Sequence, residues 1–289
     1  MKRIYGKPQA LKDVRLSYCP GCGHGIIHKL IAQCIDELGI RDDTIVVAPV
    51  GCSVFLYEYF DCDGTESSHG RAQAVATGLK RALTDKVIIA YQGDGDLAAI
   101  GTAETLHAAN RGENFTTIYV NNAIYGMTGG QMAPTTLSGQ RTATSPFGRE
   151  TAQTGYPLKI GELLSRLEAT AYIERVSVHD VKHILKAKRA IRKGIEYQMK
   201  GLGYSLVEVL AMCPTNWGMS PPDAAKWVED TMMEYYPLGV IKDKGAAGKD
   251  EDESDGGNGG KVKERKGASG EKVTAVAMRA GRAPAGKKK

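Results

Sequence analysis

The hydrophobic pattern of the chain alternates between two kinds of segment. Apolar or small residues at helical spacing predict helices over 26–38, 70–83, 97–109, 160–167, 181–199 and 223–235. Short runs of β-branched and apolar residues predict strands over 44–50, 86–91, 115–120, 171–178 and 206–210. Because these strands are apolar on both faces and alternate with helices, the pattern predicts an α/β fold, a parallel sheet with helices on both faces. In such folds, ligands bind beyond the carboxyl ends of the strands.

Two segments lack this pattern. Residues from Asn122 to about Lys159 are rich in Gly, Thr, Pro and Gln, and a loop of this length is usually functional. From Lys242 to Lys289 the chain has few apolar residues, an acidic run, a glycine-rich run and three terminal lysines. We therefore expect one folded domain over 1–241, large enough to bury a full core, and a disordered low-complexity tail over 242–289.

The charge distribution narrows the classes of partner. The formal net charge is +5, and the segment after residue 241 accounts for all of it, with 13 Lys and Arg against 8 Asp and Glu. Because the body is neutral, its charge gives no reason to expect binding of nucleic acid or of a membrane. The sequence shows neither a signal-peptide pattern nor the roughly 18–20 apolar residues of a membrane span, which predicts a cytoplasmic protein.

A candidate diphosphate and metal motif begins where the second predicted strand ends. Gly93-Asp94-Gly95-Asp96 places carboxylates and glycines before a helix whose free N–H groups favour an anion. Asn122 follows the next strand, so its amide oxygen would lie at the same edge of the sheet. One carboxylate and one amide oxygen suit Mg²⁺, with diphosphate oxygens and water completing its shell. The combined pattern resembles the thiamine diphosphate signature.

The spacing of the cysteines indicates a metal or redox site. Cys19 and Cys22 flank a tight Pro-Gly turn in a chain too long to resemble a secreted disulfide scaffold. A zinc site, a dithiol redox pair and half of an iron–sulfur site all remain possible for this pair alone. Cys52 and Cys213 each follow a predicted strand, so they would lie at the same edge of the sheet. Four converging thiolates favour a [4Fe–4S] cluster.

Taken in order along the chain, these motifs resemble the β subunit of the 2-oxoacid:ferredoxin oxidoreductases. The resemblance runs from about Ser17 to Trp217 and rests on the segments Cys19–His24, Gly51–Ser53, His69–Arg71, Gly93–Asp96 and Asn122–Gln131. It implies a thiamine diphosphate-binding fold. It also implies that this subunit holds thiamine diphosphate, Mg²⁺ and the [4Fe–4S] cluster nearest to them.

The resemblance implies a role for each motif residue. The expected cluster ligands are Cys19, Cys22, Cys52 and Cys213. The expected Mg²⁺ ligands are Asp94, Asn122 and the Ile124 carbonyl. The residues expected to line the cofactor are Gly51, Cys52, Ser53, His69, Gly93, Gly95, Asp96, Met127 and Thr128. Of these, His69 and Thr128 are expected to be catalytic.

The implied reaction converts a 2-oxoacid and coenzyme A to acyl-CoA and carbon dioxide, with electrons passed to ferredoxin. The thiazolium ylid attacks the 2-oxo carbon, and after carbon dioxide leaves, a cluster close by accepts two electrons one at a time. Thiamine enzymes generally need a second domain whose carboxylate activates the cofactor. The body has room for a single α/β domain, so we expect other subunits to supply the pyrimidine-side domain, the coenzyme A site and ferredoxin-like clusters.

The substrate and two alternative functions depend on a few positions. Some relatives that resemble 2-oxoglutarate enzymes carry lysines near Val54–Tyr57 and after Met127, where this chain has apolar residues or glycine. This favours a branched acid such as 2-oxoisovalerate, although Val54–Tyr57 also fits a packed helix start. The alternatives are a thiamine diphosphate-dependent decarboxylase or synthase without electron transfer, and a non-catalytic module with zinc at Cys19 and Cys22.

Other metal-binding residue types are interpreted as structural. Cys34 falls on the apolar face of a predicted helix, and Cys62 between two aspartates reads as a surface thiol. His179 and His183, at the start of a basic helix, are expected on the solvated surface.

Overall fold

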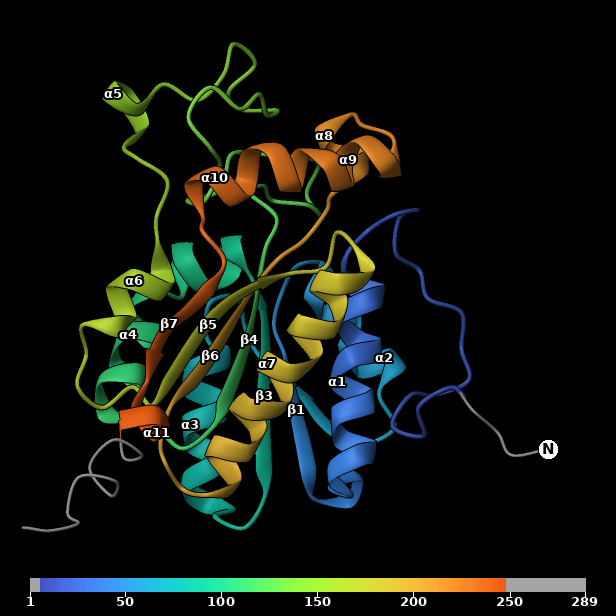
Figure 1. Ribbon diagram of the computed structural model, residues 1–289, viewed down its shortest axis with the longest axis vertical. Helices are drawn as coiled ribbons and strands as arrows, with labels where there is room; N and C mark the ends of the chain where they lie inside the picture. The colour runs from blue at the N-terminus through green and yellow to red at the C-terminus, as the bar shows by residue number, and fades with distance from the viewer. Residues whose placement is uncertain (1–5, 248–289) are drawn as a thin grey trace, which may run out of the picture.

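The computed structural model in Figure 1 describes residues 6–247 of the chain. At its centre is a seven-stranded sheet with the order β2-β1-β3-β4-β6-β5-β7. The strands are β1 (Thr44–Ala48), β2 (Asp63–Glu66), β3 (Val87–Gly93), β4 (Thr116–Asn121), β5 (Tyr172–Ser177), β6 (Ser205–Leu210) and β7 (Gly239–Asp243). All neighbouring strands pair in parallel, except that β7 runs antiparallel to β5.

The predicted α/β fold is confirmed, and two strands were not predicted. Strand β2 has the sequence Asp-Gly-Thr-Glu and is largely exposed, so it lacks an apolar pattern. Strand β7 crosses the expected boundary at residue 241 and is followed by the short helix α11 (Lys244–Ala247). Most of the segment expected to be a disordered tail, 248–289, lies outside the described residues.

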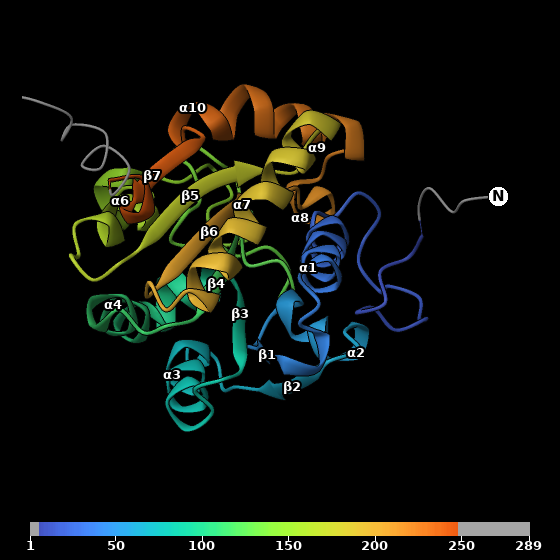
Figure 2. The same ribbon diagram turned by 60° about the horizontal axis from the view of Figure 1, so that its bottom comes forward.

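Helices cover both faces of the sheet (Figure 2). Helices α1 (His24–Leu38) and α7 (Val181–Met199) lie on one face, and α3 (Ala72–Ala82), α4 (Thr102–Arg111) and α6 (Ile160–Ser165) on the other. Successive strand residues point to opposite faces, so Val46 packs in the core beneath α1 and α7, whereas Val47 packs in the core beneath α3 and α4. Because both faces are covered, the central strands are fully buried, as the unbroken apolar runs in the sequence predict.

The helix predicted over 97–109 is interrupted. It begins as a π-helical turn over Asp96–Ile100, and α4 follows after Gly101. A Cβ on Gly101 would lie 2.6 Å from the Asp96 carbonyl oxygen and 2.9 Å from that of Gly70. The close approach of these backbones therefore requires glycine, and it distorts the first turn next to the Gly93–Asp96 motif.

A third layer crosses the carboxyl ends of the strands. It consists of the loop after β4 and of the helices α8 (Pro214–Trp217), α9 (Pro221–Trp227) and α10 (Met233–Tyr235), with a π-helical turn between α9 and α10 (Figure 1). A separate apolar cluster joins this layer to the sheet; it includes Ala123, Leu137, Leu210, Met212, Val228, Met232 and Tyr236. The short helices α2 (Leu56–Tyr59) and α5 (Thr151–Thr154) complete the described elements. None of the helices described has the length and apolar composition of a membrane span.

A buried ion-pair network ties β4, β5, β6 and α6 together. The Arg175 guanidinium, 1 % exposed, donates from Nε to Glu208 at 2.8 Å and from Nη2 to Glu162 at 2.6 Å. Asn121 donates to the other oxygen of Glu208 at 2.8 Å. Burial raises the pKa of the Glu208 carboxyl, and Arg175 opposes that rise. Removing the cation would leave a carboxyl group in the core without its counter-charge.

We expect Arg175→Met to lower the free energy of unfolding by about 3 kcal/mol, because Glu208 then stays buried and unpaired. The exposed pair Lys7–Asp13 provides the control, and Lys7→Met should cost less than about 1 kcal/mol. The double variant Arg175→Met/Glu208→Leu should recover much of the loss, since it removes both charges. Urea denaturation measures all three; equal costs for Arg175→Met and Lys7→Met would contradict the assignment.

Candidate functional site

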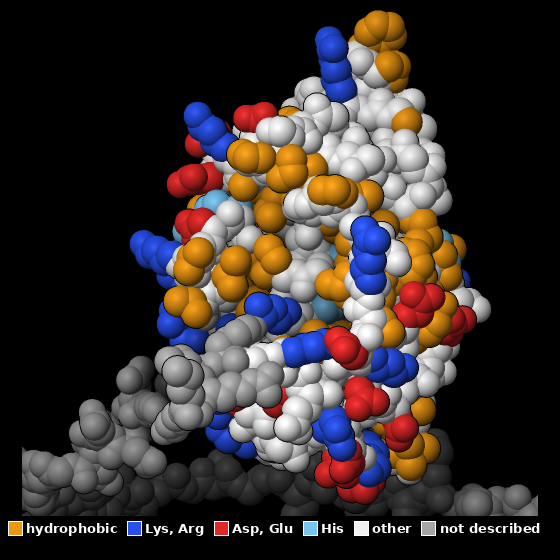
Figure 3. Space-filling model, turned by 90° about the vertical axis from the view of Figure 1, so that its right-hand side faces the viewer, with side chains coloured by type: hydrophobic (Ala, Val, Ile, Leu, Met, Phe, Trp, Pro, Cys, Tyr) orange, Lys and Arg blue, Asp and Glu red, His pale blue; other side chains and the backbone are white. Residues whose placement is uncertain are grey.

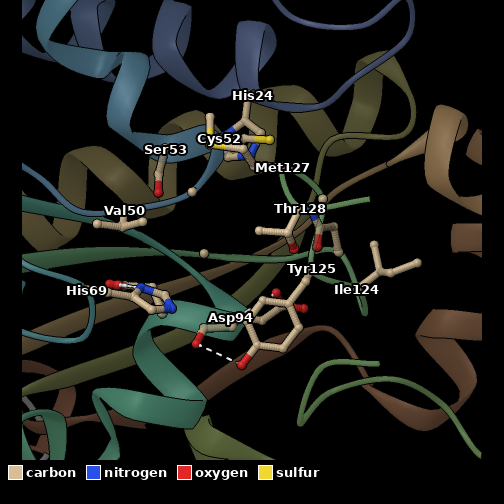
Figure 4. Close-up of a pocket in the computed structure, with 16 residues that line it drawn as sticks. His24, Val50, Cys52, Ser53, His69, Asp94, Ile124, Tyr125, Met127 and Thr128 are labelled. Atoms are coloured by element: carbon tan, nitrogen blue, oxygen red, sulfur yellow. Dashed lines mark hydrogen bonds and ion pairs between the residues drawn. The ribbon is translucent and has the colours of Figure 1, made fainter. Parts of the chain in front are cut away.

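A cavity that is open on one side lies at the carboxyl ends of β1, β3 and β4. Its walls include every residue that the sequence analysis expected to line the cofactor or to bind Mg²⁺: Gly51, Cys52, Ser53, His69, Gly93, Asp94, Gly95, Asp96, Asn122, Ile124, Met127 and Thr128. Figure 4 shows His69, Asp94 and Tyr125 toward one end and His24 with Cys52 toward the other. The tertiary fold thus brings these separate motifs to one place.

The register of β3 and β4 positions Asp94. Gly93 pairs with Val120, so Asp94 emerges beside the turn that follows β4. The carboxylate accepts hydrogen bonds from Gly95 N at 2.8 Å, from the Thr135 hydroxyl at 2.5 Å, and from the backbone N–H groups of Ala123 and Ile124. Burial raises the pKa of Asp94 to about 6, and these hydrogen bonds oppose the rise.

The turn after β4 adopts an unusual backbone conformation. Ala123 has φ = +56° and is the one described residue other than glycine with positive φ. Its carbonyl accepts hydrogen bonds from the Thr136 hydroxyl at 2.7 Å and from the Gln140 side chain at 3.2 Å, which hold the turn in place. Beside it, Asn122 Oδ1 is buried with no hydrogen-bond partner. A strained turn next to an unsatisfied oxygen that lines the cavity indicates a binding site.

Asp96 supports His69. The carboxylate of Asp96 is 3 % exposed and accepts from Gly70 N at 2.7 Å and from the Gln92 side chain. The same carboxylate lies 2.6 Å from His69 Nδ1. An ionised Asp96 can only accept here, so it fixes the tautomer with a proton on Nδ1 and leaves Nε2 of His69 available.

The far wall of the cavity is formed by residues that follow Ile124. The ring of Tyr125 lies directly against Gly95, and its hydroxyl donates to the Gly95 carbonyl at 3.3 Å. The Thr128 hydroxyl donates its proton to the Gln131 side chain. Its oxygen can therefore only accept a hydrogen bond from a group in the cavity. The sequence analysis did not identify Tyr125 or Thr135 as site residues. Tyr125 lies within the Asn122–Gln131 segment but received no role, and Thr135 lies beyond that segment in the same loop.

The four predicted cluster cysteines gather beside the cavity. Cys22 N donates to the Cys19 carbonyl at 3.0 Å, which closes the turn between them. A Cβ placed on Gly126 would lie 3.4 Å from Cys52 Sγ and 3.6 Å from Cys213 Sγ, so these two thiols flank one glycine. Burial raises the pKa of Cys22 to about 12, and the nearby Cys213, Cys52 and Cys19 thiols add to the rise.

Buried aromatic and histidine side chains lie behind the cysteines. His24 Nδ1 lies 2.5 Å from the Tyr91 hydroxyl oxygen. The His24 ring stacks on that of Tyr18, with the ring centroids 5.0 Å apart. Burial lowers the pKa of His24 to about 4, so the ring stays neutral near pH 7. His24 also lines the cavity, as its place in the Cys19–His24 motif suggests. The contact between His24 and Tyr91 could not be predicted from the sequence, because Tyr91 lies within an apolar strand.

The structure decides one open alternative and shows two interpretations of the sequence to be wrong. Phe55 and Leu56 pack into the core rather than line the cavity, which supports the packed helix start for Val54–Tyr57. Cys62 is half-buried against the same core and is not a surface thiol. The His179 side chain is 3 % exposed and that of His183 15 %, so neither is a solvated surface group.

Comparisons with known proteins identify relatives of the chain. The family described as "Thiamine pyrophosphate enzyme, C-terminal TPP binding domain" matches residues 49–209. The ketoisovalerate oxidoreductase subunit VorA of Methanothermobacter thermautotrophicus is 49% identical over 85% of this chain and 54% of its own length. The 2-oxoglutarate synthase subunit KorB of Methanocaldococcus jannaschii is 36% identical over 75% of this chain and 78% of its own. The chain thus spans about half the length of the ketoisovalerate oxidoreductase relatives.

A solved structure has a similar fold. It is described as 2-oxoglutarate:ferredoxin oxidoreductase from Magnetococcus marinus with 2-oxoglutarate, coenzyme A and succinyl-CoA bound. It superimposes with a TM-score of 0.69 at 25% sequence identity, over 84% of this chain and 87% of that chain.

The contact between Gly95 and Tyr125 gives a test of the site geometry. We expect Gly95→Ala to lower the free energy of unfolding by about 1–3 kcal/mol, because its Cβ would overlap the Tyr125 ring. In a Tyr125→Ala background the same change should cost less than about 0.5 kcal/mol. Gly93→Ala is the matched control, since a Cβ there meets no atom within 4 Å. Equal costs in both backgrounds, measured by urea denaturation, would contradict the packing described.

Proposed function

Because the chain belongs to the β subunits of the 2-oxoacid:ferredoxin oxidoreductases, we propose that it carries the thiamine diphosphate site of a multi-subunit enzyme of this kind. The enzyme would oxidatively decarboxylate a 2-oxoacid, transfer the acyl group to coenzyme A and pass the electrons to ferredoxin. One observation carries the proposal: the unsatisfied Asn122 oxygen and the buried Asp94 lie in the cavity beside which four thiols gather.

The donor set of the cavity fits Mg²⁺ and a diphosphate. A carboxylate from Asp94, the free Asn122 Oδ1 and the Ile124 carbonyl are the hard oxygen ligands that Mg²⁺ prefers. A bound cation would satisfy the Asn122 oxygen and offset the cost of burying the Asp94 charge. Gly93 leaves room for phosphate oxygens against the backbone, since no atom lies within 4 Å of the position of a Cβ there.

The cysteine arrangement favours a cluster over a single zinc ion. Ligands of one tetrahedral zinc, each about 2.3 Å from the metal, lie roughly 3.8 Å apart. Within residues 6–247, no three of the four sulfurs all lie within 4.8 Å of one another. The wider spacing suits a [4Fe–4S] cluster held by Cys19, Cys22, Cys52 and Cys213. The Asn216 side chain, which donates to Cys213 Sγ at 3.3 Å, would tune its potential.

The chain's own residues supply positioning and proton control. When bound, thiamine diphosphate provides the nucleophilic carbon for the 2-oxoacid, and the cluster provides an electron acceptor. His69, held through Nδ1 by Asp96, would take up or release a proton at Nε2. Thr128 would accept a hydrogen bond from the substrate side, because its own proton is engaged by Gln131. Cys52 lines the cavity itself, so a cluster that Cys52 helps to hold would be an electron acceptor next to the cofactor site.

The lining of the cavity favours an apolar side chain on the substrate. Val50, Ile124 and Met127 contribute apolar surface, and no lysine or arginine is among the described residues that line it. A distal carboxylate would therefore lack a counter-charge, whereas each buried CH₂ group of a branched acid gains about 0.8 kcal/mol. We propose 2-oxoisovalerate or a similar acid as the substrate. This agrees with the name of the 49% identical relative, a ketoisovalerate oxidoreductase subunit.

The surface around the cavity suits a subunit interface. Figure 3 shows hydrophobic side chains around a hollow on the face formed by the N-terminal segment and α2. Exposed apolar residues on these elements and on the cavity rim are Val14, Leu16, Val50, Tyr57 and Met127. Such a rim is typical of a surface that another protein covers. We propose that a pyrimidine-side subunit docks here and supplies the carboxylate that activates the cofactor.

The four-cysteine assignment predicts a pattern of iron content. Cys19→Ser, Cys22→Ser, Cys52→Ser and Cys213→Ser should each lower the iron bound per chain and bleach the broad absorption of the cluster. Cys34→Ser and Cys62→Ser are the matched controls, since both thiols pack against the core. Iron analysis and absorption spectra of anaerobically purified protein measure the effect. If Cys62→Ser loses iron and Cys213→Ser retains it, the assignment of Cys213 as the fourth ligand is wrong.

The Mg²⁺ assignment predicts graded losses of cofactor affinity. Asp94→Asn should abolish binding of thiamine diphosphate by the assembled complex, because the anionic diphosphate then lacks a firmly held cation. Asn122→Ala should weaken binding less, as it removes a neutral ligand. Thr135→Val is the control, because it removes a hydrogen bond to Asp94 and leaves the charge. Calorimetric titration with cofactor and Mg²⁺ measures this; an unchanged affinity in Asp94→Asn would be decisive against the site.

A further inference from the structure

A second group of metal-binding side chains lies where β5 ends and α7 begins. We propose that His179, Asp180 and His183 form a binding site for a divalent transition-metal ion of the zinc class. Their ligand atoms all lie within 4.8 Å of one another. None of the three lines the cavity described above, so the site is separate from the cofactor site.

The distances suit a metal that takes nitrogen and oxygen ligands. His179 Nε2 lies 3.5 Å from Asp180 Oδ2, close to the roughly 3.3 Å that separates two ligands about 2.0–2.1 Å from a tetrahedral zinc. The rings of His179 and His183 lie with their centroids 4.4 Å apart. Only small movements would therefore bring all three ligands onto one ion.

The His179 side chain is prepared for such a role. It is 3 % exposed, yet its Nε2 has no hydrogen-bond partner. Its other nitrogen, Nδ1, lies 2.7 Å from the hydroxyl of Ser177. If Ser177 accepts the Nδ1 proton, Nε2 presents its lone pair toward Asp180. A ring nitrogen fixed by a second group in this way is the usual arrangement of a metal-binding histidine.

The helix start holds the other ligands and leaves a coordination position open. Asp180 is the N-cap of α7, and its Oδ1 accepts from His183 N at 2.7 Å and lies 2.8 Å from His183 Nδ1. Oδ2 therefore remains for a metal, which would replace the proton shared between Oδ1 and Nδ1. The Asp180 side chain is 45 % exposed, which leaves room for water or a partner's group.

The charges around the site are of both signs. The partial positive charge of the helix start, the exposed Lys182, and Lys186 and Arg189 in the groove that His183 lines oppose a metal ion. Asp180 carries one negative charge, and Glu229 on the layer above acts on His179 as a second. Two imidazoles with carboxylate favour zinc, cobalt or nickel over Mg²⁺ or Ca²⁺, which take oxygen ligands.

Cobalt(II) is the probe, because its spectrum distinguishes this site from the cysteines. We expect the full-length chain, purified with its cluster, to bind about one Co²⁺ with d–d bands and without thiolate charge-transfer bands. His183→Gln should remove this signal. Asp180→Asn should weaken the apparent affinity about tenfold or more, while Asn still caps the helix. Equilibrium dialysis with metal analysis measures the amount bound.

Controls separate this site from other binding. His107→Gln changes an exposed histidine on α4 and should leave the spectrum and the affinity unchanged. Circular dichroism checks that each variant remains folded; His183 is the partly exposed ligand, so its replacement should be tolerated. The proposal is overturned if no Co²⁺ binds with this spectrum. It is equally overturned if His183→Gln and Asp180→Asn bind as the unaltered chain does, or if His107→Gln loses as much as they do.

Discussion

The parallel register of β3 and β4 is the constraint on which the rest of the site depends. It brings the carboxylate of Asp94 against the backbone N–H groups of Ala123 and Ile124, so the end of one strand binds the turn after the next. The left-handed conformation of Ala123 costs energy, and the loop that follows compensates through hydrogen bonds from Thr136 and Gln140. The long loop after β4 is therefore part of the site's support as well as its wall.

The same sheet edge explains how cysteines far apart in sequence come together. Cys52 follows β1, Cys213 follows β6, and the Cys19–Cys22 turn precedes α1. Gly23, the N-cap of α1, donates from its backbone N to the Met212 carbonyl at 3.2 Å, which joins this turn to the segment after β6. Gly126, in the loop after β4, lies between two of the thiols. Under the proposed function, this adjacency has a physical purpose. Electrons released at the cofactor need an acceptor close by, and one chain can fix that separation more firmly than two.

Under the proposed function, another subunit would complete the site. The cavity is open on one side, and its lining includes the exposed apolar residues Val50 and Met127. Closing such a cavity excludes water and strengthens the electrostatic interactions inside it. A neighbouring subunit that covers the rim would therefore complete both the chemistry and the packing. At one edge of the sheet, β7 pairs antiparallel with β5 and is the last strand.

The sequence by itself determined the α/β class, the central strands and the motif residues of the cavity. Apolar runs predict buried strands, and the rule that parallel strands end at one edge predicts which motifs meet. Strands β2 and β7 were missed, because an exposed or edge strand needs no unbroken apolar run. The Val54–Tyr57 segment was ambiguous, because an apolar run fits a cavity wall and a core equally. Only the tertiary structure decided the roles of Tyr125 and Thr135, because their partners Gly95 and Asp94 come from a distant segment of the chain. It also decided that His179 is buried, because the local sequence does not show which elements cover this side chain.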